Sequence, residues 1–171
     1  RIGQYTLSLH GSKSDKVFDL LCFLKEWGSL GAKPQLGYGF FKSSALQCNK
    51  THYSPDNLPE FGFFNFHFVP ANANWWTRLP GIERLMADQK ASPILRELAK
   101  KGMMPVSPVL KNVWRFKEWQ GNHQTEQALF GTLNPERIRS KIAVSWAYQD
   151  GNSWEIRGWV RIPSDPQFSS D

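Results

Sequence analysis

The sequence lacks the features of membrane-spanning and secreted proteins. No apolar run approaches the roughly 18 residues needed to cross a membrane, and no secretory signal opens the chain. Cysteine is scarce, because the 171 residues contain only Cys22 and Cys48, too few for a disulfide framework. Since Cys22 lies in an apolar helical segment, we interpret it as a reduced core residue. We therefore expect a reducing, cytoplasmic location and no membrane partner.

Clusters of catalytic or metal-binding residues are also missing. The four histidines, His10, His52, His67 and His123, are scattered along the chain, and no set of His, Cys, Asp and Glu has the spacing of a metal site. No Ser-His-Asp arrangement is evident. We therefore expect no metal, no cofactor, no small-molecule substrate and no catalytic residue. One alternative stays open, a metal-independent nuclease that uses a loop histidine, either His52 or His123.

The composition is that of a folded, moderately basic protein. Apolar residues make up 40% of the chain and aromatic residues 14%, enough to bury a real core in one domain or two small ones. There are 21 Lys and Arg against 15 Asp and Glu, which gives a net charge of +6. This balance fits an anionic partner such as a nucleic acid, although many other soluble proteins share it.

The first part of the chain predicts a strand, a helix, a glycine-rich loop and a second strand. Residues 4–10 alternate between apolar and polar, as in a half-buried strand. Ser14 can cap a helix, which ends by Gly28 or Gly31. Residues 39–46 then read as a strand.

The remainder mixes strands and helices. We expect, in chain order, a surface loop at 47–60, a strand at 61–69, helices within 82–101 interrupted near Ser92-Pro93, a strand or edge hairpin at 110–119, and a hairpin at 138–162. The pair Asp150-Gly151 is a strong signal for the turn of that hairpin. Helices mixed with antiparallel strands predict the α+β class.

The glycine-rich segment WGSLGAKPQLGYGFFK, residues 27–42, allows two interpretations. It is not a Walker motif, because no Gly-Lys-Ser/Thr stands at the required spacing. It is not a dinucleotide fingerprint either, because its glycines follow a helix and precede a strand. Its bare backbone N–H groups, with Lys33 and Gln35, could approach a phosphodiester closely. The alternative is that the glycines let the helix pack tightly against a sheet.

Two further groups combine positive charge with other features. Arg137, Arg139 and Lys141 alternate at the start of a predicted strand, which suits phosphate contact or, equally, a solvated edge that discourages strand pairing. Elsewhere cations are interleaved with aromatic residues, a pattern typical of stacking on unpaired bases or simply of a core with wet lysines. These residues are Lys100, Lys101, Lys111, Trp114, Arg115, Phe116, Lys117 and Trp119, with Trp75-Trp76 near Arg78 as a similar case.

Two segments resemble the RAMP superfamily of CRISPR proteins. The superfamily signature ends a helix in Gly-x-x-Gly-(Ala/Gly)-(Arg/Lys) and continues with Gly-(Tyr/Phe)-Gly. The matching residues here are Gly28, Gly31, Ala32, Lys33, Gly37, Tyr38 and Gly39. Downstream, LFGTLNPERIRSKIAVSWAY followed by WEIRGWVRIP is similar to the C-terminal portion of the first-numbered Cmr subunit of type III-B effector complexes. Together the segments cover about a third of the chain.

The resemblance implies a ferredoxin-like, RRM-related fold and a non-catalytic RNA-binding role. Such a subunit belongs to a ribonucleoprotein with other Cmr subunits and helps to hold crRNA and target RNA near the 3′ end of the crRNA. Its glycine loop faces the RNA. We call Arg137, Arg139 and Lys141 the basic row. The expected RNA-binding residues are this row and, in the glycine loop, Gly31, Lys33, Gln35, Gly37, Tyr38 and Gly39.

The chain also departs from the family pattern. Family loops often carry arginines where this chain has Pro34 and Gln35, which leaves Lys33 as the loop's only cation. Family members are longer, and this chain does not begin with Met, so we expect a fragment of a two-unit protein. Its expected parts are 1–47 (end of the first unit), 48–60 (loop), 61–163 (second α+β unit) and 164–171 (tail). Two alternatives to RNA binding are an assembly module that docks through exposed tryptophans and a metal-independent RAMP ribonuclease.

Overall fold

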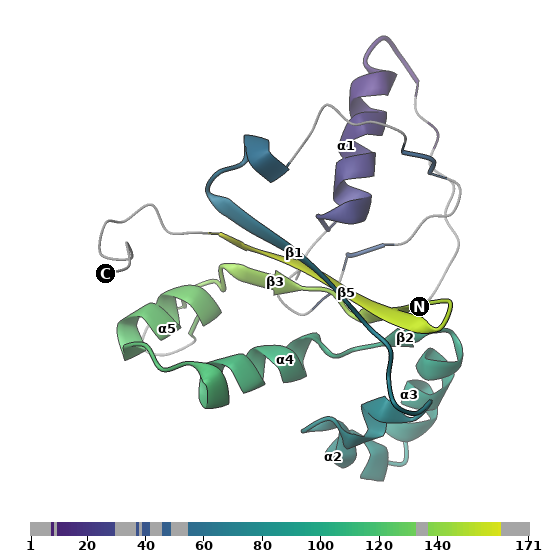
Figure 1. Ribbon diagram of the computed structural model, residues 1–171, viewed down its shortest axis with the longest axis vertical. Coiled ribbons are helices and arrows are strands. Elements are labelled where there is room, and N and C mark those ends of the chain that lie inside the picture. The colour runs from purple at the N-terminus through teal and green to yellow at the C-terminus, as the bar shows by residue number, and fades with distance from the viewer. Residues whose placement is uncertain are drawn as a thin grey trace.

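The computed structural model describes residues 8, 10–29, 37, 39–41, 46–48, 55–132 and 137–161. A twisted sheet crosses the middle of the molecule, with helix α1 on one face and helices α2 to α5 on the other (Figure 1). The strands are β1 (Phe61–Phe68), β2 (Met103–Met104), β3 (Ile142–Val144), β4 (Ala147–Asp150) and β5 (Ser153–Arg161). The helices are α1 (Ser14–Glu26), α2 (Ile82–Ala87), α3 (Ala91–Lys100), α4 (Ser107–Val113) and α5 (His123–Phe130), with short turns η2 (Pro55–Asn57), η3 (Trp75–Arg78) and the π-helical η4 (Trp114–Glu118).

In the part of the chain that the structure describes, the sheet has five strands, and their pairings are all antiparallel. Strand β5 is central: it pairs with β1 from Phe61↔Arg161 to Phe68↔Trp154, and with β3 and β4 on its other side. Strand β2 pairs with β4 at the edge. The expected α+β class is therefore confirmed. The strand order is β1-β5-β4-β2, with β3 also paired to β5.

The C-terminal hairpin is confirmed, with its turn where the sequence predicts it. Asp150 pairs with Ser153, and Gly151 between them has φ +58°, the left-handed conformation that this turn requires. The stretch that forms β3 and β4 contains a bulge relative to β5. Val144 pairs with Gly158 and Tyr148 with Glu155, so four steps along one strand match three along the other. The extra residue separates β3 from β4.

The main hydrophobic core lies between the sheet and helices α2 to α5. Its buried members come from the strands and from the helical side opposite α1: Trp76, Ile82, Leu95, Met104, Val106, Ile142, Val144, Ala147, Trp154 and Ile156. The rings of Phe68, Trp75 and Trp154 meet edge to face at 4.9 and 5.2 Å between centroids. Strand β1 therefore contributes its even-numbered phenylalanines to this side, as the predicted alternation of Phe64, Phe66 and Phe68 implies.

Helix α1 occupies the opposite face of the sheet. Its C-terminal half packs Phe23 and Trp27 against Phe63, with centroid distances of 5.6 and 5.8 Å. The predicted helix is confirmed, but Ser14 does not cap it: Lys13 holds the cap position, without a side-chain hydrogen bond. Val17, Phe18 and Leu20 remain 41%, 38% and 42% exposed.

One predicted element is wrong and two fall largely outside the described residues. Residues 107–118 form helix α4 and turn η4 rather than a strand or hairpin. The expected strand at 4–10 lies almost entirely outside the described residues, and in the expected strand at 39–46 the described residues 39–41 and 46 carry no strand. The helices within 82–101 are confirmed, with Pro93 in the first turn of α3. Among the described residues, no helix combines the length and apolar character needed to span a membrane.

Candidate nucleic-acid interface

The glycine-rich segment meets the fold through Gly37. This residue is buried, and its φ of +79° is left-handed. A Cβ there would lie 2.6 Å from Trp146 Cδ1 and 2.9 Å from both Ser107 Cβ and the Val144 carbonyl oxygen. At Gly37 the structure therefore supports the close-packing interpretation. Gly39, with φ +84°, is half-buried, and the predicted RNA contacts Gly31, Lys33, Gln35 and Tyr38 lie outside the described residues.

A buried arginine ties together the two flanks of this segment. Arg157 of β5 is only 4% exposed. Its guanidinium donates hydrogen bonds to the carbonyl oxygens of Lys25 and Glu26 at the end of α1, the latter at 3.4 Å, and to that of Phe41 at 3.1 Å. The last carbonyl groups of a helix have no hydrogen-bond donor within the helix, and Arg157 supplies the donor for two of them in α1. Sequence reasoning missed this residue, because an arginine inside an apolar strand gives no sign of what it contacts.

The two cysteines form a disulfide between α1 and the segment after the glycines. Cys22 and Cys48 are bonded, with their Cα atoms 5.6 Å apart. Lys25 Nζ donates a hydrogen bond to the Leu46 carbonyl oxygen at 2.8 Å nearby. The interpretation of Cys22 as a reduced core residue is therefore wrong, although its burial is confirmed. The bond could not be predicted from the sequence, because a single pair of cysteines far apart in sequence has no recognisable spacing. The argument for a reducing compartment no longer holds.

The basic row lies at one end of the sheet. Arg137 and Arg139 are exposed, and Lys141 is half-buried. The row is not the start of a strand: Thr132 and Ile138 form an isolated bridge, and Lys141 N–H donates to the Leu129 carbonyl oxygen at 2.8 Å. These backbone bonds fix Ile138, which stands between the two arginines, and Lys141.

The structure adds a fourth cation to the row. Arg161, exposed at the end of β5, donates its backbone N–H to the Lys141 carbonyl oxygen at 2.8 Å. Residues 160 and 142 are paired in the β3–β5 register, so Lys141 lies opposite Arg161 and on the same face of the sheet. We call Arg137, Arg139, Lys141 and Arg161 the basic corner. Arg161 was missed because its role depends on strand pairing.

The cations and aromatic residues between Lys100 and Trp119 are largely structural. Trp114 is half-buried and its ring meets that of Phe64 edge to face at 6.1 Å. Lys111 Nζ donates to Ser140 Oγ at 2.8 Å and to the Ile142 carbonyl oxygen at 3.1 Å. Burial, with a smaller contribution from the nearby Arg115 charge, lowers the pKa of Lys111 to about 8.

The remaining residues of that group either contact α5 or are exposed to solvent. Arg115 Nε lies 2.6 Å from Glu126 Oε1, and this hydrogen bond, with a smaller one from His123, lowers the pKa of the Glu126 carboxyl group. Lys100, Lys101 and Lys117 are exposed, Trp119 is half-buried, and Phe116 is 71% exposed. Trp76 is buried and Trp75 half-buried, so this pair does not supply an exposed patch.

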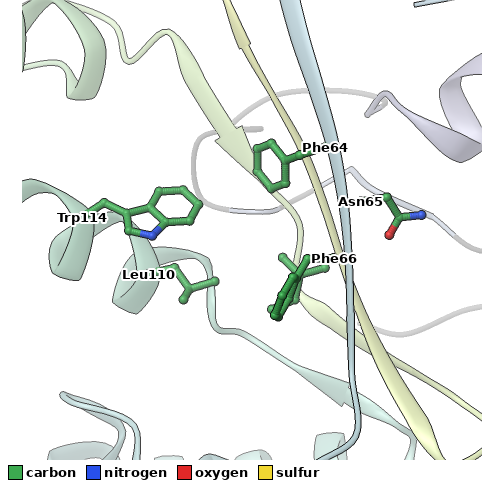
Figure 2. A pocket seen from close by; sticks show the side chains of 6 residues that line it. Phe64, Asn65, Phe66, Leu110 and Trp114 are labelled. Atoms are coloured by element: carbon green, nitrogen blue, oxygen red, sulfur yellow. The ribbon is translucent and has the colours of Figure 1, made fainter. Parts of the chain in front are cut away.

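An apolar groove opens between β1 and α4 on the core side of the sheet (Figure 2). It has a volume of about 530 Å³ and is lined by Phe64, Asn65, Phe66, Leu110, Trp114 and Ile156. In Figure 2 Phe64, Phe66, Leu110 and Trp114 surround it, while the Asn65 side chain points away. That amide donates to Glu155 Oε1 at 3.0 Å. Phe66 is 58% exposed, so the groove offers an accessible aromatic surface without a charged side chain in its lining.

The histidines do not assemble a site in the part of the chain that the structure describes. His10 and His67 are exposed, and His52 lies outside the described residues. His123 begins α5, where its ring lies 3.1 Å from Glu126 Oε2 and 2.8 Å from Gln127 Nε2. No group of three or more potential metal ligands occurs among the described residues.

Comparisons with protein-family models, curated proteins and solved structures found no match to this chain.

Proposed function

We propose that this chain is a non-catalytic RNA-binding subunit of a type III-B (Cmr) CRISPR effector ribonucleoprotein, where it helps to hold crRNA or target RNA near the 3′ end of the crRNA. The observation that carries the proposal is the basic corner, in which a backbone hydrogen bond joins Arg161 to Lys141 and two exposed arginines, Arg137 and Arg139, stand four and two residues before Lys141 in the chain. The RAMP resemblance of the sequence supplies the complex, the partner subunits and the cytoplasmic setting.

The chemistry of the corner is phosphate contact. Arginine forms bidentate hydrogen bonds with phosphate oxygens, and such contacts fix the path of a strand without reading its sequence. Sequence would be read by pairing between guide and target, as in other RNA-guided systems. Because Gly37 packs inside the fold, the proposal places most of the contact at the corner rather than at the glycines. It does not depend on a ferredoxin-like strand order.

The test is RNA binding at rising salt. Filter binding with single-stranded RNA, between about 50 and 200 mM salt, should give a log–log slope near −3, about −0.7 for each of four phosphates neutralised. Flat, weak binding would overturn the proposal.

A second candidate function, docking within the assembly, is favoured by the apolar groove. Phe66 and Phe116 are 58% and 71% exposed, and aromatic residues are enriched in protein–protein interfaces. Phe66→Ser should then abolish co-purification with other Cmr subunits and leave RNA binding unchanged. If the wild-type chain binds those subunits but no RNA, docking replaces RNA binding as its function.

The absence of catalysis is part of the proposal and has its own test. Labelled RNA incubated with the protein in EDTA should stay intact. Cleavage that persists in EDTA and is lost in either His52→Ala or His123→Ala would establish the metal-independent ribonuclease instead.

A further inference from the structure

The face of the sheet that carries α1 brings aromatic rings next to the basic corner. Side chains that are directly paired across strands, or two residues apart along one strand, share a face. Phe63 is on the α1 face, because its ring packs against Phe23. Phe61 lies two residues before Phe63 on β1, and Trp159 is the partner of Phe63 on β5. Phe61 and Trp159 therefore lie on this face too.

Arg161 and Lys141 continue the same rows. Phe61 is paired with Arg161, and Arg161 lies opposite Lys141. Across the end of the sheet one row thus reads Phe61, Arg161, Lys141, and the next row reads Phe63, Trp159 and the small Ala143. Exposed Arg139 precedes Lys141 by two residues. Two aromatic rings and the two cations Arg161 and Lys141 are therefore neighbours, although they come from three separate segments of the chain.

The rings are held in place but not fully covered. Phe61 and Trp159 meet edge to face with their centroids 5.6 Å apart, and Phe61 is stacked on Phe63 at 6.1 Å. Both Phe61 and Trp159 are half-buried. Helix α1 packs on Phe63, and the end of β5 extends past this helix (Figure 1). Fixed rings suit stacking, because little side-chain freedom is lost when a flat ligand arrives.

We propose that Phe61 and Trp159 form a stacking platform for one or two unpaired bases of single-stranded RNA, with Arg139, Lys141 and Arg161 contacting the flanking phosphates. This inference rests on the proposed RNA-binding function and specifies its ligand. Aromatic stacking beside a cationic groove is how proteins hold single strands without strong sequence preference. A duplex is a poor ligand, because its bases are already paired and stacked. The one exposed carboxylate next to Phe61 in sequence, Glu60, works against phosphate binding.

The experiment is an equilibrium titration with a single-stranded RNA of about eight nucleotides and the duplex of the same sequence. The wild-type protein should bind the single strand more tightly than the duplex. Trp159→Leu or Phe61→Leu should weaken single-strand binding about tenfold, whereas Trp159→Phe, which keeps a ring, should retain most of it. Glu60→Gln should strengthen binding.

The controls are Phe66→Leu and Trp114→Leu in the groove on the opposite face, which should bind RNA like the wild type. Thermal unfolding identifies any variant that fails to fold. Photocrosslinking of thiouridine-labelled RNA to the unaltered protein gives an independent readout and should label the peptides that contain Phe61 or Trp159.

The outcomes separate the two ideas. If the wild-type protein binds single-stranded RNA but folded Trp159→Leu and Phe61→Leu bind equally well, or if crosslinks fall only elsewhere, the platform is wrong and the proposed function stands. If the wild-type protein binds no RNA, both are wrong.

Discussion

Gly37 is fixed by its surroundings more than by any ligand. Its left-handed φ of +79° and the three atoms within 2.9 Å of a notional Cβ mean that Gly37→Ala adds both backbone strain and steric overlap. We expect the free energy of unfolding to fall by about 2–4 kcal/mol. Urea denaturation measures the loss.

Gly151→Ala is the matched control. Gly151 also has a positive φ, +58°, but nothing lies within 4 Å of a Cβ there. Only the backbone cost applies, and we expect a loss of about 1 kcal/mol. Equal losses in the two variants would show that packing against Trp146 and Ser107 is not what requires glycine at position 37.

Lys111 predicts a pH dependence of stability. Its pKa falls from 10.5 in the unfolded chain to about 8 in the fold, mainly through burial. Between these values the unfolded state binds more protons than the native state, so stability rises with pH. Below pH 8 this cost of burying the charge is fully present. Burial raises the pKa of Tyr148, which acts in the opposite direction above its ordinary value of 10, so the useful window is about pH 8 to 10.

The measurement is the free energy of unfolding at several pH values in that window, for the wild type and Lys111→Met. The wild type should gain stability relative to the variant as pH rises. A constant difference would mean that Lys111 keeps an ordinary pKa in the fold.

At the scale of elements, helix α1 depends on Arg157. Replacing it with Met keeps the bulk but leaves the carbonyl oxygens of Lys25, Glu26 and Phe41 without their donor. Since each is a hydrogen bond to a buried charge, we expect Arg157→Met to cost about 3 kcal/mol. Hydrogen exchange should rise first in α1. Arg161→Met, at the exposed end of the same strand, should change stability little, and an equal loss there would contradict the role of Arg157.

The disulfide is a second tie on α1. It closes a loop spanning 26 positions, for which chain-entropy arguments give about 3.5 kcal/mol. Adding a reductant should therefore lower the unfolding temperature of the wild type and leave a Cys22→Ser/Cys48→Ser variant unaffected. Two reactive thiols in the native, air-oxidised protein would show that the bond does not form.

Helix α4 shows why one element was mispredicted. Trp114 and Phe116 alternate with Arg115 and Lys117 along the chain, which locally imitates a strand. The helical pattern is carried instead by Leu110 and Trp114, four residues apart, which line the groove together. Pro108 in the first turn favours a helix start as well. Here the tertiary contact with β1 decides between two patterns that the local sequence supports about equally.

For the molecule as a whole, the sequence predicts what is local and misses what depends on pairing. The α+β class, the strand at 61–69 and the hairpin turn at Asp150-Gly151 follow from periodicity and turn chemistry, and the structure confirms them. The Cys22–Cys48 bond, the Arg157 contacts and the Phe61–Trp159 pair each join segments far apart in the chain, so no short motif could reveal them. The basic corner could be predicted only in part. Its first three cations alternate in sequence, but Arg161 lies opposite Lys141 only because of the sheet register.

The last prediction asks whether RNA affinity comes from the basic corner or from the overall charge of +6. A triple variant at the corner, Arg137→Gln/Arg139→Gln/Arg161→Gln, removes three charges. A second, Arg84→Gln/Arg96→Gln/Lys100→Gln, removes three exposed charges from α2 and α3 and leaves the same net charge of +3. If the corner makes the phosphate contacts, the first variant loses far more affinity than the second, and only the first has a salt slope that becomes shallower by about 2. The second should mainly slow association, as a loss of long-range steering does. Equal losses of affinity in the two variants would show that the field of the whole molecule, rather than a defined site, holds the RNA.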